Sequence, residues 1–430
     1  MTGTTEENTG EAISAPRKSS WRYIGPGIVV AATGVGAGDL VATLIAGSKF
    51  GYTLLWAAII GCVVKIALAE AAGRWHLSTG RTLFDGWRSL GSWTTIYFVG
   101  YVIVWGFVYG AAAMSSSALP LDALFPDVMD LKWWAVLCGL VGLAFVWFNH
   151  YAVFEKVMTV LVGVMFVVTV YLAIRVTPNL GDAFAGLAPV LPDGSLIYTL
   201  GLIGGVGGTI TLAAYGYWVN AKGWTNTGWM KVMRLDNRVA YITTGIFVVA
   251  MLFVGAELLH SSGVAIAKGD KGLIDLTTVL QDRYGAATAK LFLIGFFATS
   301  FTSLIGVWHG VSLMFADFVT NYRKKGEGST GAEVASGSRE KSLPFRAYLL
   351  WLTFPPIALL FLDQPFGLVI VYGVIGAFFM PFLALTLVWL LNSSRTPAEW
   401  RNGTLGNVML AGAGLLFVVL CVQQVRDLPW

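Results

Sequence analysis

The chain has 430 residues, of which 56% are apolar and 12% are charged, and its formal net charge is +4. Because a soluble domain carries about 25% charged residues, this composition excludes a soluble domain and indicates a polytopic membrane protein. Its loops are too short for an inserted catalytic domain, so we expect no enzymatic activity. Cys62, Cys138 and Cys421 lie in separate apolar stretches, so we expect buried thiols rather than disulfides or metal ligands. We expect no cofactor and no nucleic-acid partner.

Eleven apolar runs follow one another along the chain, and a helix needs about 20 apolar residues to cross a bilayer. We predict an all-α membrane fold with spanning helices near 23–47, 52–73, 94–117, 133–149, 154–175, 197–220, 239–260, 288–316, 347–362, 366–391 and 405–424. Residues 1–22 are polar and predict a cytoplasmic tail. Residues 321–345 are rich in Gly, Ser and charge, which predicts a flexible cytoplasmic loop.

The distribution of Lys and Arg predicts the orientation of these helices. With the N-terminus in the cytoplasm, nineteen of the 28 basic residues fall in cytoplasmic segments and eight fall outside, with Lys65 within a span. Cytoplasmic loops of membrane proteins carry an excess of basic residues. We therefore predict a multi-pass plasma-membrane protein with its N-terminus inside and its C-terminus outside, and we expect a monomer.

The first apolar run is interrupted at mid-depth by three glycines and a carboxylate. A glycine weakens a helix by about 1 kcal/mol, and a carboxylate at the bilayer centre costs at least about 2.5 kcal/mol. Broken backbone at this depth persists only where it faces protein or a water-filled cavity, and there its amide and carbonyl groups can bind a ligand. We predict a substrate site lined by Thr33, Gly34, Gly36, Ala37, Gly38 and Asp39.

The sixth run holds five glycines in the eight residues 201–208. The pair Gly201 and Gly205 also fits the GxxxG pattern of close helix packing, which would leave this helix continuous. Because the interrupted runs lie five helices apart, the pattern favours two inverted five-helix repeats with a binding site at the two breaks. The repeats are predicted at 23–175 and 197–391, with a further helix at 405–424. The candidate residues here are Gly207, Gly208, Thr209, Thr211, Ala213 and Tyr215.

Several segments resemble the Nramp divalent-metal transporters. The stretches 25–27, 36–39 and 47–56 are similar to the family's first-helix pattern GPA…DPGN…GGxxxGYxLLW, and Phe154-Glu155-Lys156-Val157 resembles its RLEKV before helix five. Residues 187–204 resemble the family's approach to helix six. The resemblance implies a LeuT-type fold, with helices 1–5 and 6–10 as inverted repeats plus an eleventh helix, and proton-linked uptake of divalent metal.

The same resemblance implies an altered metal site. The family's DPGN falls on residues 36–39, so its Asp ligand is replaced by Gly36 and its Asn ligand by Asp39. The family's MPH falls on residues 211–213, so Thr211 replaces the thioether ligand and Ala213 the histidine. The helix-ten glutamine falls near Tyr372. No acid lies between residues 97 and 119 on helix three, where the family keeps carboxylates, which argues against proton coupling.

The residues that remain allow three interpretations. A cation would be held by the Asp39 carboxylate, the Thr211 hydroxyl and the carbonyls of Thr33 and Gly208, an all-oxygen set suited to a hard or hydrated ion such as Mg²⁺ or Ca²⁺ rather than to Mn²⁺ or Fe²⁺. Alternatively, the half-helix N-termini would bind the carboxylate of a small organic solute such as an amino acid. The pocket would then be shaped by Tyr215, Tyr217 and Trp218. The third interpretation is a homologue that does not transport.

Other polar residues within the spans are expected to have structural roles. Lys65 and Glu70 are five residues apart, and we expect an ion pair between them or a lysine that reaches toward the interface. For His309 we expect hydrogen bonding within the packed bundle. Glu257 and His260 lie near the outer end of helix seven, where an interfacial position is the simplest interpretation.

Overall fold

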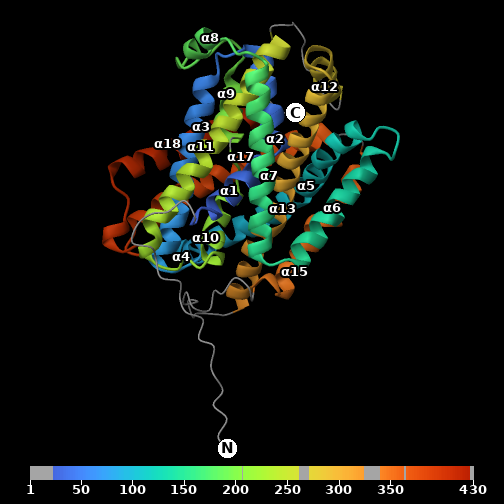
Figure 1. Cartoon of the computed structure of the whole chain (residues 1–430). Helices are drawn as coiled ribbons and strands as arrows, with labels where there is room; N and C mark the ends of the chain where they lie inside the picture. The colour runs from blue at the N-terminus through green and yellow to red at the C-terminus, as the bar shows by residue number, and fades with distance from the viewer. Residues whose placement is uncertain (1–22, 206, 261–270, 324–338, 363–364, 427–430) are drawn as a thin grey trace, which may run out of the picture.

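A computed structural model describes residues 23–205, 207–260, 271–323, 339–362 and 365–426 (Figure 1). The predicted tail 1–22 and most of the predicted loop 321–345 lie outside these residues. In the described part, every regular element is a helix and there is no strand. The all-α prediction is therefore confirmed for this part of the chain.

The helices follow the apolar runs in order. They are α1 (Pro26–Gly34), α2 (Ala37–Phe50), α3 (Leu55–Thr79), α4 (Leu83–Leu90), α5 (Ser92–Leu124), α6 (Leu131–Phe148), α7 (Tyr151–Arg175), α8 (Leu180–Ala185), α9 (Leu196–Gly205), α10 (Thr211–Ala221), η2 (Thr227–Trp229), α11 (Met230–Gly255), η3 (Ala256–His260), α12 (Lys271–Tyr284), α13 (Ala286–Arg323), α15 (Leu343–Thr353), α16 (Ile357–Leu360), α17 (Pro365–Asn392), η5 (Ala398–Trp400) and α18 (Thr404–Arg426).

Each of the eleven predicted runs coincides with one helix or with one pair of shorter helices. In the described residues, eight segments are long and apolar enough to span a membrane, and the other three runs correspond to α1 with α2, α9 with α10, and α17. The ninth run divides into α15 and α16 at Pro355 and Pro356, because proline has no backbone N–H to continue a helix.

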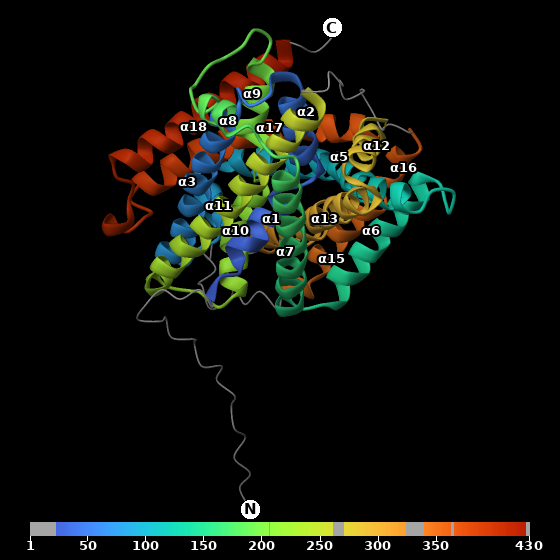
Figure 2. The ribbon, with the colours of Figure 1, turned by 45° about the horizontal axis from the view of Figure 1, so that its top comes forward.

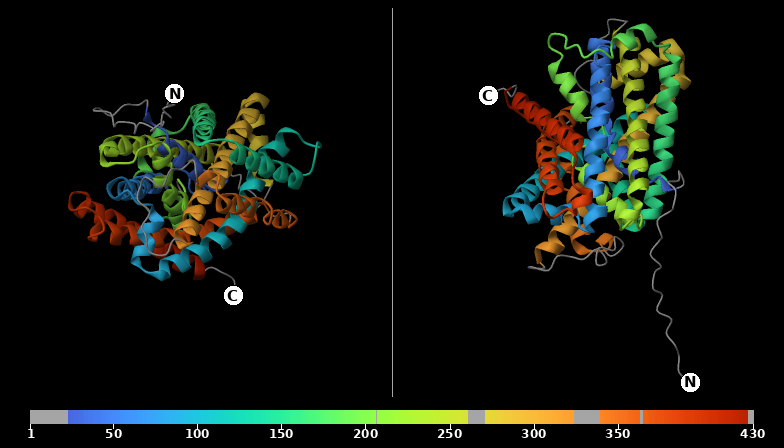
Figure 3. Two further views of the ribbon diagram at one scale, coloured as in Figure 1. Left: turned by 90° about the horizontal axis from the view of Figure 1, so that it is seen from below. Right: turned by 90° about the vertical axis from the view of Figure 1, so that its left-hand side faces the viewer.

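The two broken runs cross the middle of the bundle. Figure 1 shows α2 and α9 in one half of the molecule and α1 and α10 in the other, and Figure 2 shows α1 beside α10, α11 and α7. Contacts of α1 with α11, α13 and α10 place it among the long helices. Helix α18 packs on α17 at one side of the bundle (Figure 3). The breaks are thus enclosed by protein.

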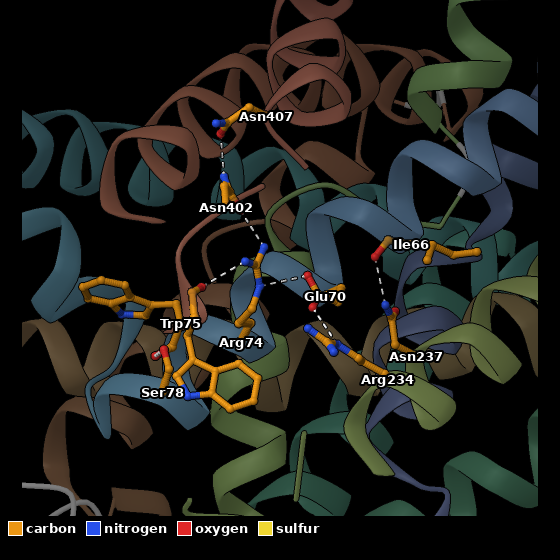
Figure 4. A network of polar contacts seen from close by, with 10 residues as sticks. Ile66, Glu70, Arg74, Trp75, Ser78, Arg234, Asn237, Asn402 and Asn407 are labelled. Atoms are coloured by element: carbon orange, nitrogen blue, oxygen red, sulfur yellow. Dashed lines mark hydrogen bonds and ion pairs between the residues drawn. The ribbon is translucent and has the colours of Figure 1, made fainter. Parts of the chain in front are cut away.

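A polar network ties one end of α3 to α11 and to the start of α18 (Figure 4). Glu70 accepts hydrogen bonds from Arg74 at 3.2 Å and from Arg234 at 3.0 Å. Arg74 also donates to the Trp400 carbonyl at 3.0 Å and to the Asn402 side-chain oxygen at 2.7 Å. The Glu70 carboxylate, which lies within a span, is therefore paired with these two arginines and not with Lys65.

Candidate functional site

The two helix breaks contact each other through glycine. Helix α1 ends at Gly34, and a Cβ added there would overlap the carbonyl carbon of Gly207 and lie 2.5 Å from the Gly208 nitrogen. Gly207 and Gly208 have φ angles of +76° and +90°, which residues other than glycine rarely adopt. The sixth run is therefore broken, and the alternative of a continuous GxxxG packing helix is wrong.

The break in the first run exposes backbone groups that neighbouring side chains satisfy. The Thr33 carbonyl accepts a hydrogen bond from the Ser303 hydroxyl of α13 at 2.8 Å. The Thr33 hydroxyl donates to the Val29 carbonyl of its own helix at 2.6 Å. An ideal Cβ on Gly36 would lie 2.8 Å from the Ser303 oxygen and 3.9 Å from the Tyr372 hydroxyl. Thus Thr33, Gly36 and Tyr372, predicted from distant parts of the sequence, lie together.

Helices α5 and α17 form a wall beside the breaks. On α17, Tyr372, Gly376 and Met380 follow one another at intervals of four residues and so share a face. An ideal Cβ on Gly376 would lie 3.4 Å from the Thr209 hydroxyl and 3.7 Å from Trp105 Nε1. The close approach at Gly376 therefore brings Thr209 of the second break to this wall.

Aromatic rings on α5 continue the wall. Tyr97, Tyr101, Trp105 and Tyr109 lie four residues apart, and the ring centroids of successive pairs are 6.1, 6.3 and 4.5 Å apart. The Tyr109 hydroxyl hydrogen-bonds with the Ser303 hydroxyl at 2.8 Å, and its ring meets Tyr372 edge-on at 5.2 Å. Rings thus line this side of the site.

Two buried polar atoms at the second break have no hydrogen-bond partner among the described residues. Thr211 is 3% exposed, and its hydroxyl lies beside Gly208 without a bond. Trp105 is 1% exposed, and its indole N–H is likewise unbonded. Because buried polar groups normally have partners, these two atoms are candidates for contact with a bound substrate.

Lys65 of α3 reaches the same break, which the sequence interpretation missed. Its side chain is completely buried, and its ammonium donates a hydrogen bond to the Gly208 carbonyl. Glu70 pairs with arginines instead. Both expectations for Lys65, an ion pair with Glu70 and a reach toward the interface, are therefore wrong. The available signal was the charge itself, since an ionisable residue within a span is a functional candidate by default.

Tyr215 lies away from the breaks, near the N-terminal end of α1. Its hydroxyl donates to the Asp236 carboxylate of α11 at 2.9 Å. The same carboxylate accepts from the backbone N–H groups of Gly25 at 2.8 Å and Gly27 at 2.5 Å, and it is fully buried. Asp236 therefore fixes the start of α1 to α11 and α10, and Tyr215 supports that contact instead of lining the substrate site.

The neighbouring aromatic residues of α10 are also directed elsewhere. Tyr217 donates to the Asp317 carboxylate at 2.6 Å, and Trp218 donates to His309 at 3.0 Å, both on α13. His309 also contacts Glu340 at 3.1 Å, so its expected hydrogen-bonded packing role is confirmed. The proposed aromatic pocket of residues 215, 217 and 218 is not assembled at the breaks.

The remaining predicted residues follow the two breaks. Ala37, Gly38 and Asp39 lie in the first turn of α2, but their side chains are outside what the structure describes. Ala213 is fully buried in α10. Among the described residues, no group of three or more His, Cys, Asp or Glu side chains could hold a metal ion. The ligand set proposed from the sequence stays a prediction.

The C-terminal end of the seventh span is a π-helical segment, η3. Glu257 there accepts a hydrogen bond from the Tyr52 hydroxyl at 2.5 Å and from the backbone N–H of Asn179 at 3.2 Å. His260 contacts the Ser48 carbonyl at the end of α2 at 2.9 Å. Both residues thus hold the C-terminal end of α2, and the turn that follows it, to neighbouring segments.

The chain matches the family model described as natural resistance-associated macrophage protein-like over residues 27–426. It belongs to this Nramp family. The resemblance predicted from the sequence is thereby confirmed, and so is the assignment as a multi-pass membrane transporter rather than an enzyme.

Relatives and solved structures of the family agree with this assignment. The "divalent metal cation transporter MntH" of Mycobacterium leprae is 26% identical over 416 residues, covering 91% of this chain and 88% of the relative. The MntH protein of Mycobacterium tuberculosis strain H37Rv is 25% identical over 392 residues, covering 87% of this chain and 84% of the relative.

Two solved structures show the fold. The Eremococcus coleocola manganese transporter, solved with an aromatic bis-isothiourea compound, superposes with a TM-score of 0.75 at 16% identity, covering 100% of this chain and 93% of that one. MhsT in complex with L-phenylalanine superposes with a TM-score of 0.53 at 15% identity, covering 92% and 97%. The predicted LeuT-type fold with broken first and sixth helices is confirmed.

Proposed function

We propose that this Nramp-family protein is a secondary transporter that moves a divalent metal ion across the plasma membrane, binding it where the two helix breaks meet. The observation that carries the proposal is the contact of Gly34 with Gly207 and Gly208 in the middle of the bundle. Unwound backbone at this depth supplies carbonyl groups to a substrate. The curated relatives with the printed name divalent metal cation transporter supply the substrate class.

The proposed ligands are oxygen atoms. They comprise the unbonded Thr211 hydroxyl, the carbonyls of Thr33 and Gly208, and the carboxylate of Asp39. Without a sulfur ligand, such a site suits Mg²⁺ or Ca²⁺, bound with part of their hydration shell, better than Mn²⁺ or Fe²⁺. In this proposal the protein works as a monomer with a cytoplasmic N-terminus.

Transport of the metal is proposed to proceed without proton movement along α5. The sequence of this helix between residues 97 and 119 contains no acidic residue, and its inward face carries the stacked rings of Tyr101, Trp105 and Tyr109. A phenol or an indole releases its proton far less readily than a carboxylic acid does. A pH gradient should therefore leave the flux unchanged.

The test is flux of Mn²⁺, Mg²⁺ and Ca²⁺ into proteoliposomes, with and without a pH gradient. We expect Mg²⁺ or Ca²⁺ uptake that is lost in Asp39→Ala and Thr211→Val and is retained in Gly163→Ala, since nothing lies within 4 Å of a Cβ at Gly163. Uptake of none of the three ions by the wild-type protein would refute the metal proposal.

A second candidate, transport of a small organic solute with a carboxylate group, is favoured by the donors around the second break. The Lys65 ammonium, the unbonded Trp105 N–H and the Thr211 hydroxyl are the kind of groups that recognise an anion. Thermal stabilisation of the protein by amino acids but not by divalent ions would favour this candidate over the first.

A further inference from the structure

Lys65 places a positive charge at the centre of the molecule. It lies near the middle of α3, and none of its surface is exposed. Its ammonium donates to the Gly208 carbonyl, lies 4.0 Å from the Met380 sulfur of α17 and is 5.6 Å from the centre of the Phe417 ring of α18. Three segments distant in sequence therefore surround this one nitrogen.

The Gly208 carbonyl is available to Lys65 because the helix is broken there. In a continuous helix each carbonyl accepts a bond from the N–H four residues later. Gly208, with a φ of +90°, stands outside both α9 and α10. Carbonyls released in this way coordinate cations in transporters with broken helices, and an ammonium group satisfies such an oxygen as an inorganic cation does.

A second observation shows that the break is not fully satisfied by Lys65. The Thr211 hydroxyl, beside Gly208, is buried and has no bond among the described residues. If Lys65 were only a packing element, the adjacent hydroxyl would be expected to find a partner within the bundle. The break therefore combines an oxygen already occupied by a cationic group with an oxygen still open to a ligand.

We propose that the Lys65 ammonium is the resident cation of this break and determines its specificity, by occupying the Gly208 carbonyl in competition with a metal ion. A divalent ion then binds tightly only when Lys65 leaves Gly208, because two positive charges cannot share one carbonyl without strong repulsion. This inference rests on the proposed function for the identity of the competing ion, but it concerns binding rather than transport.

The experiment measures Mg²⁺, Ca²⁺ and Mn²⁺ binding to the purified full chain in detergent by isothermal titration calorimetry. Lys65→Met removes the charge but keeps an unbranched side chain beside Met380 and Phe417, and Lys65→Arg keeps the charge. We expect at least one ion to bind about 10–100-fold more tightly to Lys65→Met than to the wild type, the range typical of changes next to metal ligands. Lys65→Arg should show no such gain.

Val63→Met is the matched control, since it adds the same side chain to α3 at a position that is 43% exposed. It should bind metal as the wild type does. Equal or weaker metal binding by folded Lys65→Met would overturn the proposal and leave Lys65 as a packing element.

A variant that fails to fold also gives an answer. Lys65→Met and Lys65→Gln would then be purified with either Mg²⁺ or butylammonium at about 10 mM, roughly ten times the concentration that half-saturates a site with a Kd of about 1 mM. Recovery of folded protein with one of these cations supports the proposal, and failure with both overturns it. If wild-type vesicles transport no metal but Lys65→Met gains binding, the proposed function fails and this inference stands.

Discussion

Removal of the Asp236 carboxylate should release the start of α1 from the bundle. The carboxylate accepts three hydrogen bonds, from the backbone N–H groups of Gly25 and Gly27 and from the Tyr215 hydroxyl, at 2.5–2.9 Å. An unsatisfied buried donor costs about 1–3 kcal/mol. Asp236→Ala leaves the Gly25 and Gly27 donors without this partner, whereas the Tyr215 hydroxyl can still donate to the Met233 carbonyl 3.2 Å away. The variant should therefore lower the free energy of unfolding by about 2 kcal/mol or more.

The loss in the free energy of unfolding should increase in steps across a series of variants. Tyr215→Phe removes one of the three donors and should cost about 1 kcal/mol, and Asp236→Asn, which keeps one acceptor oxygen, should fall between Tyr215→Phe and Asp236→Ala. Thermal unfolding in detergent measures the series. At about 2 °C per kcal/mol, Asp236→Ala should melt about 4 °C below the wild type.

The control for this series is Thr243→Val, on the same helix α11, because the Thr243 hydroxyl bonds back to the Val239 carbonyl of its own helix at 2.9 Å. It should melt close to the wild type. A second measurement is the rate at which maleimide labels a cysteine placed at Tyr23, whose ring packs on Trp229 at 5.5 Å. Asp236→Ala should label faster. Unchanged melting together with unchanged labelling would refute the reasoning.

Three further predictions concern other contacts. Gly34→Ala forces a Cβ into the Gly207 carbonyl, so it should abolish transport and cost about 1–3 kcal/mol in stability; transport by Gly34→Ala at the rate of Gly163→Ala would contradict the contact of the breaks. Arg74→Ala should cost about 3–5 kcal/mol because the 9% exposed Arg74 side chain is paired with Glu70. Arg234 pairs with the same carboxylate but is 41% exposed, so Arg234→Ala should cost less than about 1 kcal/mol. Equal melting temperatures of the two variants would show that burial does not determine how much each ion pair contributes to stability. Trp105→Phe should cost only about 1–2 kcal/mol in stability, through lost packing of the buried ring, because its indole N–H has no partner in the described structure, but it should weaken substrate uptake. A stability loss well above this range with unchanged uptake would show that the N–H serves the fold instead.

The positions of the helices could be predicted from the sequence, because each membrane span requires a continuous run of about 20 mostly apolar residues. The two breaks could also be predicted, since several glycines within a span oppose helix formation in any surroundings. At Gly207 and Gly208 the φ angles are positive, which is why the chain needs glycine at these two positions and why the helix is interrupted there. Local chemistry therefore suffices for this part of the fold.

Contacts between distant helices could not be predicted in the same way. Lys65 and Gly208 are 143 residues apart, and their contact depends on how α3 is rotated against the break. Tyr215 follows the second break closely in sequence, yet the buried Asp236 carboxylate draws its hydroxyl toward the start of α1. The ring series on α5 is regular in sequence, but a lipid-facing stripe would have the same spacing.

The anchoring of α10 has a mechanical consequence. Its side chains are fastened at three points, by Tyr215 to Asp236, by Tyr217 to Asp317 and by Trp218 to His309. The start of α1 is fastened to the same partner helix through the single Asp236 carboxylate. Loss of that one carboxylate would therefore free the start of α1, whereas α10 would stay fastened to α13 through Tyr217 and Trp218.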